Sequence, residues 1–372
     1  MNKILKIFFF NFLLFFSFIL ILELIFGSWL KKQNWGNTLR SERLKKISYS
    51  VKFKENTYDF VYRKNSLGFR GEEVEPDKIK IIMMGGSTVN QRFTPQNLTV
   101  VGQLNKLLGN DNINLKIYNG GVDGQSTVGL ISNFKKWFPN INNFNPKIIV
   151  YYIGVNERFY YNYNPNPENF ETGEFKTPHA FDRMQKSTSK ERFIDYIKNN
   201  SFISSKVKKI QLKYFLKKTR KPDYSKFTAT YNLGYNKAAY ILNYYKEKKF
   251  YSQIEANKIF DIDDLLYFKS NYYKSLNARL SHLVKLTYDI DAEPIFINQV
   301  LNDGQRSESM YFTNYIVRDF CKKNNIKLID IASFIKFNQG DFYDEFHTTP
   351  DGSKIIAEVI YPLLKNYLNQ IL

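Results

Sequence analysis

Five short apolar runs are spaced along the chain, and stretches of helical pattern lie between them. The runs cover residues 80–84, 115–119, 148–153, 294–298 and 327–330. Helical patterns cover 100–108, 126–137 and 310–324, and Thr349-Pro350 opens a last helix that extends to the C-terminus. Continuous apolar strands that alternate with helices are typical of a parallel sheet covered on both faces. We therefore predict an α/β fold.

The N-terminal segment is a long apolar stretch. Residues 7–30 are apolar apart from four positions, and at about 1.5 Å per residue they can cross a hydrocarbon core of about 30 Å. A cleaved signal peptide is the alternative, but no small-residue cleavage site follows the run. Instead Trp29, Lys31 and Lys32 follow, and these residue types suit the membrane interface. We predict an uncleaved single-pass helix.

The orientation of this helix does not follow from charge. More lysines and arginines follow the span than precede it, so positive-inside counting would keep the large domain in the cytoplasm. Long domains, however, translocate largely regardless of such charge. The topology must therefore be argued from chemistry.

By pattern, the chain divides into five parts. These are an anchor at 1–32, a stalk and N-terminal extension at 33–75, a first core part at 76–160, an insertion at 161–290 and a second core part at 291–372. The alternation of strands and helices stops within the insertion. Helical patterns at 190–218, 235–260 and 263–288 predict that the insertion is helical.

Composition excludes several classes of protein. The 372 residues are enough for about two and a half average domains, and 43% hydrophobic residues argue against general disorder. A single cysteine excludes a disulfide scaffold and a thiolate-rich metal site, and three histidines disfavour a multi-histidine centre. We expect neither a metal nor an organic cofactor.

The formal charge of +19 could suit nucleic acid, anionic lipid or an acidic glycan. Between Lys190 and Lys221 there are eleven basic residues and two acidic ones. A helix here with Ile203, Val207 and Ile210 on one face could lie on an anionic membrane, face an acidic glycan, or simply be solvated and pack on the core. Nucleic acid is disfavoured, because no recognition motif accompanies the charge.

Three loops that follow predicted strands bring polar groups to the carboxyl end of the sheet, where active residues of such folds gather. Gly85-Gly86-Ser87-Thr88 can expose the Ser87 hydroxyl in a tight turn. The loop from Asn119 to Gly124 can point a glycine N–H into a cleft, and Gly154-Val155-Asn156 can offer a side-chain amide. Read alone, each is also an ordinary turn or helix cap.

Near the C-terminus, Asp344 precedes His347 by three residues. One helix-like turn can place the carboxylate on the imidazole and fix its tautomer, so that the other ring nitrogen can accept a proton. A solvated pair of this kind is the alternative. Asp351, in the first turn of the last helix, suits the helix dipole rather than catalysis.

In this order and after these strands, the four segments together resemble the SGNH hydrolase family, also called GDSL-type esterases. The matching blocks are Gly-x-Ser at 85–87, Asn-x-x-x-x-Gly at 119–124, Gly-x-Asn at 154–156 and Asp-x-x-His at 344–347. The resemblance covers about 79–160 and 293–372, and it implies a flavodoxin-like three-layer α/β/α sandwich. Gly86 stands where the family often has Asp, which puts only the turn geometry in doubt.

The resemblance implies that Ser87 is the nucleophile, His347 its general base and Asp344 the orienting acid. The chemistry of these groups gives the same roles, because a serine hydroxyl is weak until a base removes its proton and the imidazolium then needs an anion. The backbone N–H groups of Ser87 and Gly124 and the Asn156 side chain look like the oxyanion hole.

We therefore expect a serine esterase that removes O-acyl groups, in particular O-acetyl groups, from a cell-surface polysaccharide. Its partners would be membrane lipid, through the N-terminal helix, and the acylated carbohydrate. Its catalytic domain would lie outside the cytoplasmic (inner) membrane. The alternatives are an O-acyltransferase of the same fold, a lipase or thioesterase that uses the aromatic-rich insertion as an acyl-chain cleft, and a non-catalytic glycan-binding protein. The sequence gives no oligomeric state.

Overall fold

The structure is a computed structural model. It describes residues 3–27, 29, 43–53, 55–162, 193–194, 196–197, 200–204, 206–207, 210, 237–242, 249–338 and 340–371. The chain forms two compact units. The smaller unit comprises Met1–Arg40 and Ser187–Tyr224, and the larger comprises Ser41–Lys186 and Ser225–Leu372.

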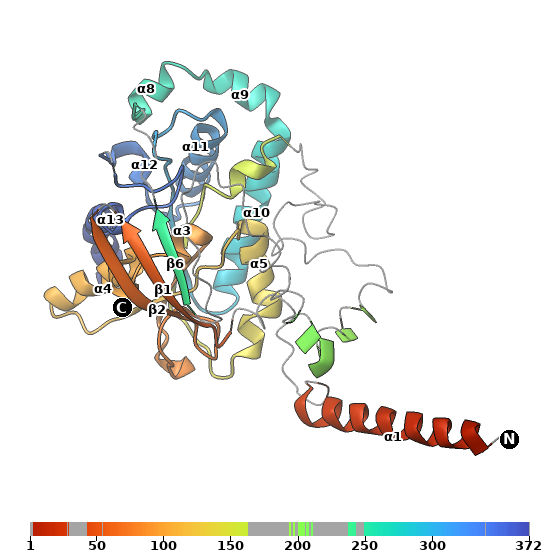
Figure 1. The fold of residues 1–372 in the computed structure, drawn as a ribbon. Coiled ribbons are helices and arrows are strands. Elements are labelled where there is room, and N and C mark those ends of the chain that lie inside the picture. The colour runs from red at the N-terminus through yellow and green to blue at the C-terminus, as the bar shows by residue number, and fades with distance from the viewer. Residues whose placement is uncertain are drawn as a thin grey trace. The chain divides into compact units, whose positions relative to one another are not determined.

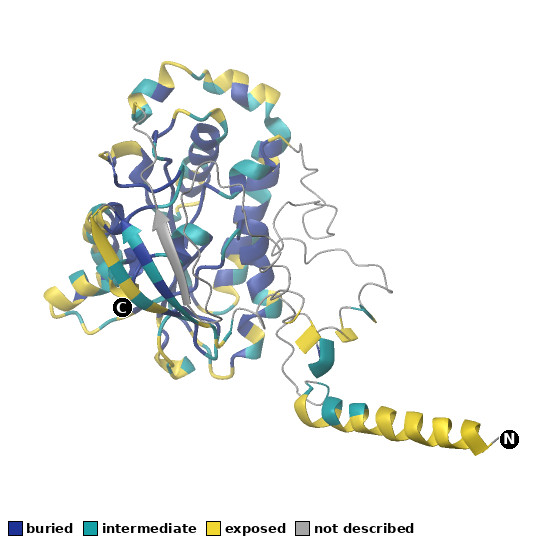
Figure 2. Ribbon diagram, viewed as in Figure 1, coloured by how far each residue is buried: buried dark blue, intermediate teal, exposed yellow. Residues whose placement is uncertain are grey.

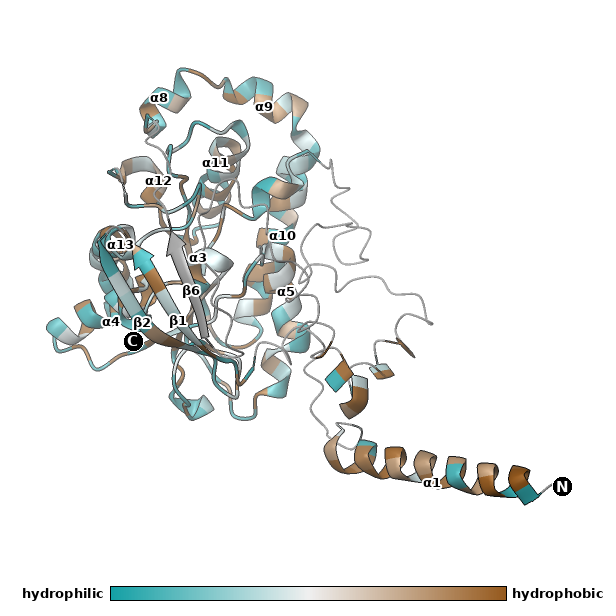
Figure 3. Ribbon diagram, viewed as in Figure 1, coloured by the Kyte–Doolittle hydropathy of each residue, from teal (hydrophilic) through white to brown (hydrophobic). Residues whose placement is uncertain are grey.

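The smaller unit contains helix α1 (Lys3–Phe26), in which no residue is buried. Figure 2 shows α1 coloured as exposed or intermediate along its length, and Figure 3 shows that most of it is hydrophobic. By length and composition α1 is able to cross a membrane, as the sequence predicts. Most of the predicted helix at 190–218 lies outside the described residues, but 202–204, 206, 207 and 210 are helical.

The larger unit is built on a five-stranded sheet. Figure 1 labels most of the helices of this unit and the three strands of a second, smaller sheet. The strands of the five-stranded sheet are β3 (Ile81–Gly85), β4 (Ile117–Asn119), β5 (Ile148–Tyr152), β7 (Glu293–Ile297) and β8 (Lys327–Ile329). The strand order is β4-β3-β5-β7-β8 and every pair is parallel. Numbered along the chain, this is the flavodoxin-like order 2-1-3-4-5. The predicted fold class is confirmed.

Helices cover both faces of this sheet. Helices α4 (Val100–Asn110) and α13 (Pro350–Ile371) pack together over the face that presents Ile81, Met83 and Val150. Helices α5 (Thr127–Lys136), α10 (Ser270–Tyr288) and α11 (Glu308–Lys323) cover the other face. There the ring of Tyr151 stacks on Phe296. Every residue of β3 and β5 is buried, which explains why these strands read as continuous apolar runs.

A second, smaller sheet corrects two predictions. Strands β1 (Lys46–Phe53) and β2 (Asn56–Arg63) form an antiparallel hairpin within the range assigned to a stalk. Strand β6 (Lys237–Leu242) pairs with β1 in parallel, although the pattern at 235–260 predicts a helix. Tyr49, Val51 and Phe53 alternate along β1 as its buried side chains, which is the period of a half-buried strand.

The rest of the predicted insertion is helical where it is described. Helices α8 (Gln253–Asn257) and α9 (Ile262–Phe268) precede α10, so the prediction at 263–288 is confirmed. Residues 163–192 and 211–236 lie outside the described residues. Because α10 packs on β7 and α5, it belongs to the helical layer of the sheet and not to a separate domain.

Candidate active site

The predicted site residues lie at the point where the strand order reverses. From β3 the chain passes to β4 on one side and then returns to β5 on the other, so the loops after β3 and β5 leave a crevice between them. Ligands of open α/β sheets bind at such switch points. Ser87 follows β3 directly, and Asn156 lies four residues beyond the end of β5.

Ser87 is the first residue of the short helix α3 (Ser87–Asn90), with Gly86 at its N-cap. The N–H groups of a first turn have no partner within their own helix, so the Ser87 N–H is available to a ligand. The turn ends at Gln91, whose φ of 44° lies in the left-handed region. The nucleophile candidate therefore stands on a single tight turn between strand and loop.

The hydroxyl of Ser87, the ring of His347 and the carboxylate of Asp344 form one hydrogen-bonded chain. Ser87 Oγ lies 2.7 Å from His347 Nε2, and His347 Nδ1 lies 2.5 Å from Asp344 Oδ2. When Nδ1 donates to the carboxylate, Nε2 is left as the acceptor for the serine hydroxyl. The structure thus brings Ser87 together with two residues that follow it by 257 and 260 positions in the chain, in the geometry that activates an alcohol.

The acid and the base are held by one turn of backbone. The second carboxylate oxygen of Asp344, Oδ1, accepts the N–H groups of Phe346 at 2.9 Å and His347 at 2.6 Å. The ring of Tyr343 stacks on the imidazole at 5.5 Å between centroids, with 8° between the planes. Thr349 N donates to Asp341 O at 2.8 Å and closes the base of the loop. The imidazole is therefore fixed in position and in tautomer.

The candidate oxyanion groups line the same cleft as Ser87. Gly124 has a φ of 76°, a conformation that glycine adopts without a Cβ penalty. The Asn156 side chain donates through Nδ2 to Gln125 O at 2.8 Å, which orients the amide beside the serine loop. A Cβ on Gly86 would lie only 2.1 Å from Asn156 Nδ2. A larger residue at position 86 would therefore displace the Asn156 amide.

The cleft has a volume of about 350 Å³. Its walls combine the aromatic rings of Phe93, Phe159, Tyr343 and Phe346 with a charged pair, Arg92 and Asp123. Arg92 Nη2 lies 2.6 Å from Asp123 Oδ2. Burial alone would raise the pKa of Asp123, but Arg92 and the Asn90 amide outweigh it and keep the pKa below its ordinary value. Burial raises the pKa of Tyr343 well above its ordinary value, so this phenol stays neutral.

Two glutamines that the sequence analysis does not identify connect the site loops. Gln299 Nε2 donates to Thr88 Oγ1 at 2.8 Å, and its Oε1 accepts Val155 N at 2.7 Å. Gln91 Nε2 donates to Thr348 Oγ1 at 3.0 Å, and its Oε1 accepts Val100 N at 2.7 Å. A lone glutamine after a strand or in a loop has no spacing signal, so sequence alone could not find either.

The N-terminal extension also supports the site. Arg70, which is buried, donates to the backbone carbonyls of Asn90, Gln91 and Thr94 in the loop after α3. Burial lowers the pKa of this guanidinium to about 10. Lys64 Nζ donates to Gly121 O at 2.8 Å in the loop of Gly124. Residues assigned to a stalk therefore brace two of the three loops.

Among the described residues, the structure has no group of three or more acidic, histidine or cysteine side chains placed to hold a metal ion. The crevice itself presents a serine, an imidazole, a carboxylate and the hydrogen-bond donors around them.

Solved structures with a similar fold include proteins of the lipolytic G-D-S-L family and an acetylxylan esterase. A member of the lipolytic G-D-S-L family from Veillonella parvula shares 12% identity over 77% of this chain and 98% of its own, with a TM-score of 0.41. A catalytic mutant of Axe2, an acetylxylan esterase from Geobacillus stearothermophilus, shares 11% sequence identity over 77% of this chain and 94% of its own, with a TM-score of 0.40. TesA shares 9% sequence identity over 77% of this chain and 98% of its own, also with a TM-score of 0.40. No protein-family model and no curated protein sequence matches the chain.

Proposed function

We propose that the chain is a serine esterase that works through an acyl-enzyme. The observation that supports this most directly is the chain of short contacts from Ser87 Oγ through His347 to Asp344, at 2.7 Å and 2.5 Å. A nucleophile in contact with a base, and the base in contact with an acid that orients it, is the arrangement that activates serine. In this proposal Ser87, His347 and Asp344 are the catalytic residues.

The reaction proceeds in two halves. Ser87 Oγ bonds to the acyl carbon of the substrate while its proton passes to His347 Nε2, and the carbonyl oxygen becomes an oxyanion. The bond to the leaving alcohol then breaks, and His347 returns the proton to that alcohol. Water repeats the sequence in the second half, which releases the carboxylic acid and restores the serine. Asp344 stays ionised and stabilises the imidazolium in both halves.

The oxyanion is stabilised by the N–H groups of Ser87 and Gly124 and by the Asn156 amide. The position of the Ser87 N–H at the start of α3 and the Asn156 side chain in the same cleft support this role. Removal of one such donor typically costs about 10² to 10³ in kcat.

The proposed substrate is an O-acylated, in particular O-acetylated, carbohydrate of the cell surface. The support is the lining of the cleft, in which aromatic rings offer apolar faces to a sugar ring and the Arg92–Asp123 pair offers a donor and an acceptor for hydroxyl groups. A charged pair beside the nucleophile suits a polar alcohol better than a long acyl chain. Transfer of the acyl group to a sugar hydroxyl would use the same acyl-enzyme.

The protein is further proposed to be anchored in the cytoplasmic membrane by α1, with the catalytic unit outside. Glu23, in the last turn of α1, accepts hydrogen bonds from residues 201–203, so the helix takes part in the folded structure. That contact supports a retained anchor over a cleaved leader. Alkaline phosphatase fused after Lys32 should be active, and an inactive fusion would place the catalytic unit in the cytoplasm.

A fluorophosphonate probe tests the nucleophile. The full-length protein in detergent should be labelled and should hydrolyse a small acetyl ester, whereas Ser87→Ala should lose labelling and lower kcat by about 10⁴ to 10⁶. Ser126→Ala is the matched control, because Ser126 is the N-cap of α5, where its hydroxyl accepts a hydrogen bond from Val128 N. This variant should be labelled as the wild type is.

Assays of the same preparation with different esters and acceptors test which acyl group is removed and whether water or a sugar accepts it. Acetylated oligosaccharides should be deacetylated faster than long-chain esters, and a free sugar should not capture the acetyl group in preference to water. Preferred turnover of long-chain esters would support a lipase, and efficient capture by a sugar would support an acyltransferase. A folded wild type that neither binds the probe nor cleaves any of these donors would contradict the enzymatic proposal.

A further inference from the structure

The carboxylate of Glu23 is an unusual group for an apolar helix. In α1, which otherwise presents apolar side chains near its C-terminal end, Glu23 accepts four hydrogen bonds. The donors are Trp29 Nε1 at 2.9 Å, Ser201 Oγ at 2.6 Å, Phe202 N at 2.8 Å and Ile203 N at 3.0 Å. A charge in such a helix is costly unless it is fully hydrogen-bonded, and here both oxygens have partners.

Three of these donors belong to the start of a second helical segment. Ser201 caps that segment, because its Oγ accepts Ser204 N at 2.9 Å, and the next N–H groups donate to Glu23. An anion at the first turn of a helix is stabilised by the unpaired N–H groups and the dipole. The Glu23 carboxylate therefore fixes where the segment after residue 201 begins.

Aromatic contacts strengthen the same junction. The ring of Phe26, the last residue of α1, lies 5.2 Å from that of Phe202. The ring of Trp29 lies 5.9 Å from that of Tyr196, and Lys206 Nζ lies 5.2 Å from the Phe202 ring. All of these residues belong to the smaller unit. The segment is thus attached to the end of α1 by hydrogen bonds and by ring packing.

The position of the junction along α1 sets its depth in a bilayer. Twenty or so residues of α1 precede Glu23, about the number needed to cross the hydrocarbon core. Trp29 beyond it suits the headgroup region. Residues 201–203, which are hydrogen-bonded to Glu23, are therefore expected at the membrane interface.

The residues on both sides of this junction have a composition that suits a membrane interface. Residues 190–221, the basic segment, contain eleven basic and two acidic side chains. Its described apolar side chains are largely exposed, including Phe193 at 64%, Val207 at 45% and Ile210 at 66%. Exposed apolar groups among many cations fit a surface of acyl chains below anionic headgroups, whereas an acidic glycan would leave the apolar groups uncovered.

We propose that the basic segment binds the surface of an anionic bilayer and that Glu23 docks it onto the anchor. The described residues within 201–210 and the end of α1 then form one membrane-interface element, with Val207 and Ile210 in the acyl boundary and Lys206 at a lipid phosphate. This inference rests on the proposed anchor and is independent of the proposed catalysis.

A fluorescent reporter at Ile210 tests the proposal. Full-length Ile210→Cys, labelled with an environment-sensitive dye, is reconstituted in nanodiscs of phosphatidylcholine alone or with about one third phosphatidylglycerol. The native Cys321 will not compete, because it is buried and its thiol pKa is raised to about 12. We expect a blue shift and a several-fold rise in emission in the anionic discs only, reversed by high salt.

Two matched variants define the result. The same dye on Ile259→Cys, an exposed apolar position of the larger unit at 54%, should not respond to anionic lipid. Glu23→Gln combined with Ile210→Cys should weaken the response several-fold, because the neutral amide is a poorer acceptor for the helix N–H groups.

Three outcomes would overturn the inference. An Ile210 signal that is the same in both discs contradicts lipid binding while leaving the anchor intact. A response to a soluble acidic polysaccharide in neutral discs, with none to anionic lipid, would assign the segment to a glycan. Failure of the full-length chain to enter discs would overturn the anchor and the inference together, whereas ester hydrolysis by the same sample reports on catalysis separately.

Discussion

At the scale of single residues, the site depends on how closely its loops approach. Gly86 has a φ of −84°, which any residue can adopt, so its backbone does not require glycine. The requirement is steric, because a Cβ would lie 2.1 Å from Asn156 Nδ2 and 3.2 Å from Gln125 O. The Asn156 amide is the end of a flexible side chain, so it would move before the backbone did.

Gly86→Ala should therefore damage catalysis more than stability. We expect kcat to fall by about 10², the effect of losing one oxyanion donor, with little change in the unfolding midpoint. In an Asn156→Ala background the same substitution should cost almost nothing, since the displaced group is already absent. Steady-state kinetics of the four proteins in this cycle measure the coupling, and additive losses would contradict it.

Ser87, Gly124 and Asn156 could be predicted from the sequence, because each lies in a loop after a buried strand and topology brings such loops to one edge. Asp344 and His347 could be predicted from their three-residue spacing. Ser87, Asp344 and His347 are brought together as expected, with Gly124 and Asn156 in the same cleft. Gln299, Gln91 and Arg70 could not be predicted. Their roles depend on contacts between segments far apart in the chain, and no local pattern records such contacts.

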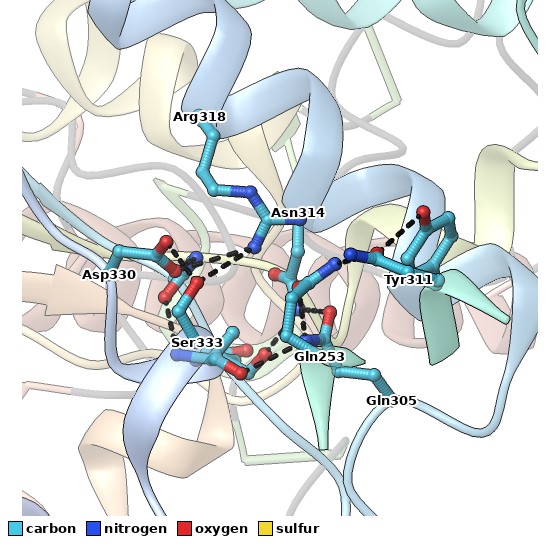
Figure 4. A network of polar contacts seen from close by, with 11 residues as sticks. Gln253, Gln305, Tyr311, Asn314, Arg318, Asp330 and Ser333 are labelled. Atoms are coloured by element: carbon cyan, nitrogen blue, oxygen red, sulfur yellow. Dashed lines mark hydrogen bonds and ion pairs between the residues drawn. The ribbon is translucent and has the colours of Figure 1, made fainter. Parts of the chain in front are cut away.

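At the scale of elements, a network of buried amides joins the site to the helical layer. Gln299 connects Thr88 of α3 with Val155 after β5, and its backbone carbonyl accepts Asn314 Nδ2 of α11 at 2.8 Å. Asn314 also donates to Gln305, whose own amide reaches Gln253 of α8 and Ala332 of α12 (Ile331–Phe334) (Figure 4). Gln299 and Gln305 are both buried, but only Gln299 is hydrogen-bonded to the loops of Ser87 and Asn156.

Gln299→Leu and Gln305→Leu form a matched pair. Each leaves buried partners unsatisfied and should lower the free energy of unfolding by about 1 to 3 kcal/mol. Only Gln299→Leu should also lower kcat, by roughly tenfold or more with KM little changed, because Gln299 positions the loops of Ser87 and Asn156 without touching substrate.

Urea unfolding and ester hydrolysis of both variants measure these effects. Equal losses of kcat in the two variants, or a loss confined to KM, would show that Gln299 acts only through general stability.

One element that the sequence predicts wrongly has a state that depends on a distant partner. The sequence of β6 contains Lys237, two alanines and Leu242, all good helix formers, yet β6 pairs with β1 almost two hundred residues earlier. Strand β1 is a different case, because its apolar and polar residues alternate from Ile47 to Phe53 and this signal is local. Strands β3 and β5 could be predicted because burial on both faces makes them uniformly apolar.

At the scale of the whole larger unit, one buried ion pair joins three elements. Arg279 of α10 lies 3.2 Å from Glu157, and both side chains are almost completely buried. Glu157 also accepts Thr127 N and Thr127 Oγ1 at the start of α5. Because Glu157 is next to Asn156, the pair fixes the loop of Asn156 against the helical layer.

Arg279→Met should destabilise the protein by about 3 to 5 kcal/mol, because it leaves the Glu157 carboxylate buried without its cation. The double variant with Glu157→Gln should recover part of this loss, since a neutral amide has a smaller desolvation cost. Thermal or urea unfolding of the full-length proteins in detergent measures both. A single variant within about 0.5 kcal/mol of the wild type would contradict the structural role.

The turn that holds Asp344 and His347 has a consequence for motion. Three contacts of the Asp344 carboxylate fall within the same four residues, on the N–H groups of Phe346 and His347 and on the imidazole. If this loop swings, the acid and the base travel as one rigid body and their separation hardly changes. Thermal motion of the loop would then change mainly the distance between the imidazole and the Ser87 hydroxyl. This distance would decide whether a proton can pass between them.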